Sequence, residues 1–369
     1  MLKSVVYVHS EAILSQMRKL DIIENRSQIV HELIKSYGLL NYCQVIAPQK
    51  CSYEDLRSFH SADYVDCLKQ YTTSQEISYE QFGLEYDCLP FEEIYDFVTT
   101  VAGSTLAAVD AIINGASIAI NWNGGWHHAQ RDKAAGFSYV NDIVIAIHRL
   151  RTKFQKVLYL DLDIHHGDGV EHAFNFSKYV MTISFHQYEP GFYPGTGAVS
   201  DIGFGNGRGY TINAPYSRYI SSAAFVAYFR QIVSAAFETF QPQVCVMQCG
   251  ADVIVGDRLG GSNLLPEDCI EAMKEIFTWN IPITFLGGGG YNNINTAKYW
   301  TQLTASILGV TIPRDIPENN FFLLYGPDYV LDIYRANTQD ENLQHDLLKN
   351  ASIIKENLNR YVLNVLITR

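Results

Sequence analysis

Residues 161–169 concentrate more reactive chemistry than any other part of this sequence. They hold three carboxylates and two imidazoles, directly after the apolar run at 157–160. Such a run is typical of a buried strand, which does not end in this much charge without a partner. Asp163 and His165 are two residues apart, so their side chains share one face of an extended chain. They form a chelating pair with the nitrogen and oxygen ligands that suit zinc, whereas a solvated loop would explain only one or two of these polar residues.

Asp252 is the natural third ligand, and three protein ligands leave an open position for water, as in catalytic zinc sites. Zinc lowers the pKa of bound water to about 7 and polarises a carbonyl oxygen. The reaction then needs a base, and His127 and His128, in a Gly-Gly-Trp-His-His turn, are candidates. Asp161 and Asp168 are further carboxylates that could each orient one of these imidazoles.

Tyr291 follows four glycines, a run that is poor in any regular element. The glycines indicate close approach of backbone and substrate, and the tyrosine hydroxyl could donate to a developing oxyanion. These parts together describe metal-assisted hydrolysis of an amide or ester. Taken singly, each has a structural explanation: the glycines could form a turn, and the histidine pair could be a cap or a core pair. His186 fits a hydrogen-bonded histidine at a strand end, Cys249 a packed thiol, and Arg26 a helix-surface cation.

The elements that must position these residues alternate along the chain. Short β-rich runs predict strands at residues 5–8, 117–121, 156–160, 180–185, 243–248 and 281–286. Helical patterns cover residues 26–38, 92–114, 140–153, 221–240, 266–279 and 295–308. This alternation predicts an α/β fold, a single domain over residues 1–369 with a parallel sheet flanked by helices on both faces.

Polar side chains follow five of the predicted strands. His127 and His128 come after the strand at 117–121, the 161–169 cluster after 156–160, and His186 after 180–185. Asp252 and Tyr291 come after the strands at 243–248 and 281–286. Open α/β sheets bind ligands beyond the carboxyl ends of their strands. The chemistry is therefore expected at one edge of the sheet.

Composition narrows the class of protein. With 369 residues, 47% hydrophobic and 18% charged, the chain is expected to be globular, with neither a membrane span nor a signal peptide. Seven scattered cysteines without a Cys-x-x-Cys pair favour core thiols in a reducing compartment. The net charge of −12 argues against direct nucleic-acid binding. It is compatible with a cationic partner such as a lysine-rich peptide, although solubility explains it equally well.

Five motifs stand in the order seen in class I zinc-dependent histone deacetylases, which this chain resembles. They are Gly-Gly-Trp-His-His-Ala (124–129), Asp-x-Asp-x-His-His-Gly-Asp-Gly (161–169), Pro-Gly-Phe-Tyr-Pro-Gly-Thr-Gly (190–197), Gly-Ala-Asp (250–252) and Gly-Gly-Gly-Gly-Tyr (287–291). The resemblance runs from about residue 5 to residue 329 and beyond. It implies the arginase/deacetylase fold and a zinc-dependent lysine deacetylase that hydrolyses acetyl-lysine to lysine and acetate.

The resemblance also implies a role for each matching residue. Zinc would be held by Asp163, His165 and Asp252. His128 would be the general base and acid and His127 would give electrostatic help, with Asp168 and Asp161 as their respective partners. Tyr291 would stabilise the tetrahedral intermediate. The acetyl-lysine tunnel would be formed by Gly136, Phe137 and Tyr193 with Leu259 nearby, Asp87 would grip the substrate backbone, and Arg26 and Trp126 would lie by an internal acetate-release pocket.

Two potassium sites are implied as well. One would be formed by Asp161, Asp163, His165, Ser184 and Phe185, and the other by Phe174, Ser177, Val180 and Tyr210. Acetylated proteins such as histone tails would be the substrates, in the nucleus and the cytoplasm. Acetylated polyamines are an alternative substrate class. A scaffold or acetyl-lysine reader that kept the fold is a non-enzymatic alternative, against which the intact ligand set, histidine pair and Tyr291 argue.

The chain departs from the family pattern at several positions. Tyr193 stands where the tunnel usually has Phe, which puts a hydroxyl at its wall, and His9 replaces an aromatic residue expected near the acetate pocket. Ile294 replaces an Arg that complex-forming members carry, and their long acidic tail is absent. Both differences argue against membership of an inositol-phosphate-bridged corepressor complex. The ending at 343–366 instead reads as an amphipathic helix that packs on the domain.

Overall fold

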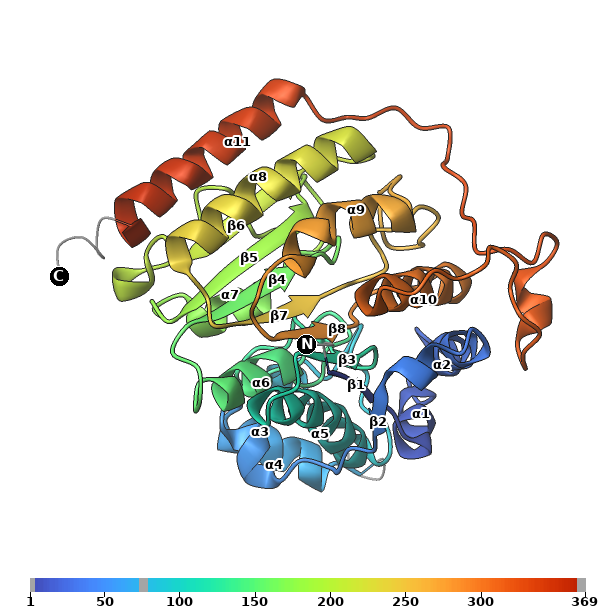
Figure 1. Cartoon of the computed structure of the whole chain (residues 1–369). Helices are drawn as coiled ribbons and strands as arrows, with labels where there is room; N and C mark the ends of the chain where they lie inside the picture. The colour runs from blue at the N-terminus through green and yellow to red at the C-terminus, as the bar shows by residue number, and fades with distance from the viewer. Residues whose placement is uncertain (1–3, 73–78, 364–369) are drawn as a thin grey trace.

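A computed structural model describes residues 4–72 and 79–363, and its centre is one eight-stranded sheet (Figure 1). The strand order is β2-β1-β3-β8-β7-β4-β5-β6, and all seven neighbouring pairs are parallel. The strands are β1 (Val5–Val8), β2 (Gln44–Ile46), β3 (Ile118–Asn121), β4 (Val157–Asp161), β5 (Val180–Gln187), β6 (Thr211–Tyr216), β7 (Val244–Gln248) and β8 (Ile283–Leu286). The predicted parallel sheet is thus confirmed.

Helices cover both faces of this sheet, as predicted (Figure 1). One layer holds α1 (Glu11–Met17), α3 (Tyr53–Arg57), α4 (Ala62–Gln70), α5 (Ile94–Ile113), α6 (Asp142–Leu150) and α7 (Asp168–Phe174). The other holds α2 (Arg26–Ser36), α8 (Ser222–Phe240), α9 (Pro266–Phe277), α10 (Asn293–Leu308) and α11 (Gln344–Asn357). Because successive strand residues point to opposite faces, Leu158 and Leu160 of β4 join one core while Val157 and Tyr159 join the other.

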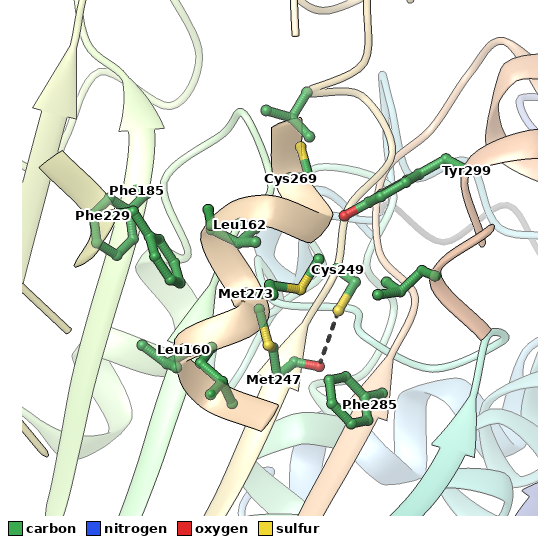
Figure 2. Packing of buried hydrophobic residues seen from close by; sticks show 14 of the residues in the cluster. Leu160, Leu162, Phe185, Phe229, Met247, Cys249, Cys269, Met273, Phe285 and Tyr299 are labelled. Carbon is green, nitrogen blue, oxygen red and sulfur yellow. Dashed lines mark hydrogen bonds between the residues drawn. The ribbon is translucent and has the colours of Figure 1, made fainter. Parts of the chain in front are cut away.

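Five of the seven cysteines are buried, as the prediction of core thiols requires, and three of these lie in the larger core, whereas Cys43 and Cys67 are only half-buried. Figure 2 shows Cys249 and Cys269 among Met247, Met273 and other apolar side chains of this layer. Both are free thiols, and burial raises the pKa of each well above its usual range. They are therefore inert packing groups, Cys249 directly after β7 and Cys269 in α9.

Helix α5 corrects one expectation. Its 20 residues are long and apolar enough to cross a membrane by length and composition, whereas no such stretch was expected. In the fold, 72% of the relevant window is buried, and the helix packs against α6 and the sheet. Its Ser104 and Thr105 hydroxyls bond the side chains of Asn121 and Asp142. These contacts make α5 a core helix of the α/β layer.

The shortest elements escaped sequence prediction. Strand β2 has three residues, and α1, α3 and α7 have five to seven, too few for a clear hydrophobic period. Strand β6 contains Pro215, which a sheet tolerates because β6 lies at its edge. The predicted C-terminal helix exists as α11 and continues as a π-helix over Leu358–Leu363, and residues 364–366 lie outside the described part.

Candidate active site

Five neighbouring strands deliver the candidate residues to one edge of the sheet. Strands β3, β8, β7, β4 and β5 are adjacent in that order, and each is followed by a polar segment that sequence analysis singled out. Since the strands are parallel, all their carboxyl ends meet at this edge. The predicted convergence of the chemistry is therefore confirmed.

Asp163, His165 and Asp252 form a buried cluster whose donor atoms all lie within 4.8 Å of one another. The His165 Nδ1 atom is 3.1 Å from Asp163 Oδ1 and 3.0 Å from Asp252 Oδ2. Among the described residues it is the only group of His, Cys, Asp and Glu side chains with this geometry. Two carboxylates and one imidazole match the ligand set of a catalytic zinc site.

Hydrogen bonds hold the two carboxylates in place. Asp163 Oδ2 accepts from Gln248 Nε2 and from the Gly289 amide, both at 2.8 Å, and Asp252 Oδ1 accepts from the Ile164 amide at 3.0 Å. These supporting contacts are the partners that orient metal ligands. Sequence reasoning missed Gln248, although it ends the predicted strand at 243–248 on the polar edge.

The electrostatics of the cluster fit a bound cation. Burial and then the neighbouring Asp163 carboxylate raise the pKa of Asp252 well above its usual range. Burial disfavours charge on His165 too, yet Asp163 and Asp252 together raise its pKa to about 10. Two carboxylates this close repel each other in a low-dielectric site, and a cation between them removes that repulsion. The donor set therefore fits a divalent metal.

The histidine pair lies beside the cluster, and each imidazole has its own carboxylate. His127 Nδ1 is 2.7 Å from Asp161 Oδ2, and His128 Nδ1 is 2.7 Å from Asp168 Oδ1. Their Nε2 atoms face each other at 2.9 Å. The structure thus contains the predicted pairing of imidazole and carboxylate, and both histidines are buried.

The two imidazoles have opposite proton affinities. Burial lowers the pKa of His127, but Asp161 and Asp163 outweigh it and raise that pKa to about 9. Burial and then the charge of His127 lower the pKa of His128 to about 4, although Asp168 opposes this. At neutral pH one imidazole is therefore charged and its neighbour is neutral.

Asp161 joins the histidine pair to the metal cluster. Besides His127, its carboxylate accepts from the Tyr159 hydroxyl at 2.6 Å and from the Asp163 amide at 3.0 Å. Tyr159 lies two residues before Asp161 on the same face of β4, a signal that sequence reasoning could have used. The carboxylate is fully buried with three partners, so its position is fixed.

The tetraglycine run brings backbone against buried side chains. A Cβ atom on Gly288 would clash with Gln248, and one on Gly289 would clash with Asp252. Gly288 also has a φ of 143°, which side chains other than glycine rarely adopt. The glycines were predicted to let the backbone approach a substrate. In the structure they let it approach Gln248 and Asp252, the side chains of the metal cluster and its support.

Arg26 is buried and reaches this run, so the helix-surface interpretation is wrong. Its Nη1 donates to the carbonyls of Gly288 and Gly290 at 3.0 and 2.9 Å. Its guanidinium lies 5.1 Å from the ring centre of Trp300. The cation therefore fixes the backbone that leads to Tyr291.

One small cavity brings the candidate groups together. Its lining consists of Ile23, Arg26, Gly125, Trp126, His127, His128, Gly136, Ser138, Asp163, Gly288, Gly289 and Tyr291. Burial and then the Asp252 and Asp163 carboxylates raise the pKa of Tyr291 well above its usual range. Its hydroxyl is therefore protonated and can donate a hydrogen bond in this cavity.

Of the predicted tunnel residues, Gly136 lines the cavity, and Asp87, Phe137 and Tyr193 contact Gly136 or the cavity residues His128 and Tyr291. The Gly136 amide donates to Asp87 at 3.0 Å, and a Cβ on Gly136 would meet the His128 ring and the Tyr193 hydroxyl. Tyr193 stands edge-on to His128 with ring centres 5.0 Å apart, and Phe137 lies 5.6 Å from Tyr291. Tyr193, Asp87 and Leu259 are all exposed at the surface.

His186 and His9 lie apart from the catalytic groups. His186 bonds Ser184 Oγ and the Gly197 carbonyl, both at 2.9 Å, in agreement with a hydrogen-bonded strand-end histidine. His9 stacks on His31 with ring centres 3.4 Å apart. Neither lines the cavity that holds the histidine pair.

The sequence matches the histone deacetylase domain over residues 22–307, a range that contains every residue of this cavity. It is 42% identical to histone deacetylase 8 of Danio rerio over 364 residues, 98% of this chain and 96% of that protein. It is 41% identical to histone deacetylase 8 of Xenopus tropicalis over 362 residues, 97% and 98% of the two chains. It is 39% identical to histone deacetylase 1 of Homo sapiens over 339 residues, 90% of this chain and 70% of that protein.

Proposed function

This chain belongs to the histone deacetylase family, and on that premise we propose that it is a zinc-dependent lysine deacetylase of the class I, histone deacetylase 8-like type. It hydrolyses the acetyl-lysine amide to lysine and acetate. The observation that carries the proposal is the single cavity that joins the histidine pair, a metal-ligand carboxylate and Tyr291. A scaffold or reader of acetyl-lysine would not need these groups together.

Zinc would be held by Asp163, His165 and Asp252, where it would lower the pKa of a water and polarise the acetyl carbonyl. The pKa of His128 is lowered to about 4, so its imidazole is neutral at pH 7 and can take a proton from the attacking water. Its Nδ1–H donates to Asp168, which fixes the tautomer that leaves Nε2 as the acceptor. His128 then returns the proton to the leaving amine.

His127 and Tyr291 stabilise negative charge that develops on the substrate. The carboxylates of Asp161 and Asp163 keep His127 protonated, so it places a positive charge beside His128. The Tyr291 hydroxyl keeps its proton and donates to the carbonyl oxygen as it becomes an oxyanion. Removal of one such donor commonly costs about 10²–10³-fold in kcat.

The rim residues accept the acetylated side chain and its backbone. Phe137 and Tyr193 flank the lysine stem beside Gly136, Asp87 receives the substrate backbone at the rim, and Leu259 contributes an apolar surface. Acetylated proteins such as histone tails are the proposed substrates, in the nucleus and the cytoplasm. The net charge of −12 favours such cationic partners over nucleic acid. Arg26 and Trp126, which line the cavity, would accompany release of acetate.

Two potassium ions complete the proposal. Asp161 and Ser184 are paired residues of β4 and β5, next to Asp163, His165 and Phe185. At the second site, carbonyl oxygens of Phe174 and Tyr210 already accept main-chain hydrogen bonds and keep a lone pair for a cation. Val180 and Ser177 would supply its remaining ligands. Membership of an inositol-phosphate-bridged corepressor complex is not proposed, because Ile294 replaces the expected Arg.

The test compares acetate release from an acetyl-lysine peptide by the wild-type chain and by Tyr291→Phe, with acetylspermidine as a second substrate. We expect the peptide to be the better substrate and the variant to lose about 10²–10³-fold in kcat while its thermal unfolding is unchanged. Equal kcat in the two proteins contradicts the role of Tyr291. Preference for acetylspermidine would move the substrate class to polyamines.

A further inference from the structure

Tyr291 is the catalytic donor in the proposed reaction, yet within the described part of the chain no side chain bonds its hydroxyl. Its ring contacts Phe137, and the glycines before it include Gly288 and Gly290 with φ values of 143° and 132°. Arg26 holds the carbonyls of Gly288 and Gly290, but catalysis needs the hydroxyl of Tyr291 placed to a fraction of an ångström, which also requires restraint of Tyr291 itself. Hydrogen bonds to the main chain of Tyr291 supply that restraint.

Asp257 supplies one half of that restraint. Its Oδ2 accepts from the amides of Tyr291 at 2.6 Å and Asn292 at 3.1 Å, and its Oδ1 accepts from the Leu259 amide at 2.9 Å. Hydrogen bonds to an ionised carboxylate are about twice as strong as neutral ones. One carboxylate thereby ties the loop after β7 to the segment that leads from β8 into α10.

Arg258 supplies the other half. Its Nε donates to the Tyr291 carbonyl at 2.9 Å, and its Nη2 donates to the Ile22 carbonyl at 3.2 Å. Adjacent residues thus hold both polar main-chain groups of Tyr291, the amide through Asp257 and the carbonyl through Arg258. The Ile22 contact extends the restraint to the segment between α1 and α2, next to Ile23 in the cavity lining.

We propose that Asp257 and Arg258 are positioning residues for Tyr291 and, through Leu259, for the tunnel rim. This inference rests on the proposed function, because it assigns them a part in the same reaction. They touch no reacting atom and act only through the placement of the Tyr291 hydroxyl. Their removal should then lower kcat more than it changes KM, since it affects an interaction made in the transition state.

The experiment is a double-mutant cycle on the full chain, with Asp257→Ala, Tyr291→Phe and the double variant. We expect Asp257→Ala to lower kcat roughly 10- to 100-fold with little change in KM, the scale of an ångström-sized misplacement. The double variant should be no slower than Tyr291→Phe, because Asp257 then has no hydroxyl to position. Amide hydrogen exchange across residues 287–292 should rise in Asp257→Ala, a readout that does not depend on activity.

Asp340→Ala is the matched control. Its carboxylate likewise bridges main-chain amides, in this case the two of Ser221 at 2.7 Å and Asn342 at 2.8 Å, but it lies in the segment before α11. We expect wild-type kcat from it. If Asp257→Ala does not fold, Asp257→Asn and Arg258→Lys replace it in the same cycle, with smaller losses in the same direction.

The outcomes separate the two proposals. Losses that add in the double variant overturn the positioning role, and so does an Asp257 variant with wild-type kcat. If Tyr291→Phe itself keeps wild-type kcat, the proposed role of Tyr291 as the catalytic hydrogen-bond donor is refuted. In that case the double-mutant cycle measures no coupling between Asp257 and the Tyr291 hydroxyl. A loss of kcat in Asp340→Ala equal to that of Asp257→Ala assigns the effect to general loosening of the fold and also overturns the inference.

Discussion

His60 makes stability depend on pH through a hydrogen-bond pattern that only the neutral imidazole satisfies. The ring is fully buried, its Nε2 accepts from the Asn141 amide at 3.0 Å, and its Nδ1 is 3.2 Å from the Arg131 carbonyl. A protonated ring has two donors and cannot accept from Asn141. Burial lowers the pKa of His60 from 6.5 to about 4 in the folded chain, although the backbone carbonyls of Arg131 and Gln130 oppose this.

The sign and size of the effect follow from this difference in pKa. Between about pH 6.5 and pH 4 the unfolded chain binds a proton at this position and the folded chain does not, so stability falls as the pH falls. One pKa unit corresponds to about 1.4 kcal/mol, which gives a loss of about 2 kcal/mol from His60 between about pH 7.5 and pH 5. Below pH 4 both states are protonated and the loss stops growing.

Urea unfolding of the wild-type chain and His60→Gln at these two pH values measures this contribution. Glutamine offers one donor and one acceptor but does not titrate, so the variant should lose about 2 kcal/mol less than wild type on acidification. Other buried histidines, such as His31, titrate in both proteins and cancel in the comparison. An identical pH dependence in the two proteins would refute the assigned hydrogen bonding of His60.

Three further predictions concern the site. Asp168→Asn should lower kcat roughly 10- to 150-fold in a peptide deacetylation assay, because a hydrogen bond to a charged group contributes about 1.5–3 kcal/mol. An unchanged kcat would show that the 2.7 Å hydrogen bond between Asp168 and His128 has no part in the reaction. Tyr193→Phe should lower KM for an acetyl-lysine peptide about fivefold at constant kcat. The reason is that the apolar lysine stem of the substrate no longer has to desolvate the Tyr193 hydroxyl beside Gly136. A higher KM in the variant would contradict this. Asp252→Asn should reduce zinc content in metal analysis, with Asp340→Asn as the control that keeps it.

The ligand cluster and the histidine pair could be predicted because each of their residues lies in a short polar stretch directly after a predicted buried strand. Asp163 and His165 follow the end of β4 by two and four residues, and Asp252 follows the end of β7 by four, so the sheet edge at which they meet could be inferred. Asp257 and His60 could not be found in this way. Their roles consist of hydrogen bonds to main-chain amides and carbonyls of distant segments, which leave no pattern in residue types. Strand β6 was hidden for a different reason, since Pro215 suits only an edge position that topology decides.

His127 and His128 have different pKa values because the charged groups around them differ. His127 faces the fully buried Asp161 and has its Nε2 3.8 Å from Asp163, so two carboxylates hold its proton. His128 has one carboxylate, Asp168, and a charged neighbour 2.9 Å away. Two identical neighbouring side chains thereby differ in proton affinity, since the pKa of His127 is raised to about 9 and that of His128 is lowered to about 4, and this difference separates the acid from the base at a single pH. Because a proton on His128 would face the charge of His127, the pair favours passing that proton on to the leaving amine.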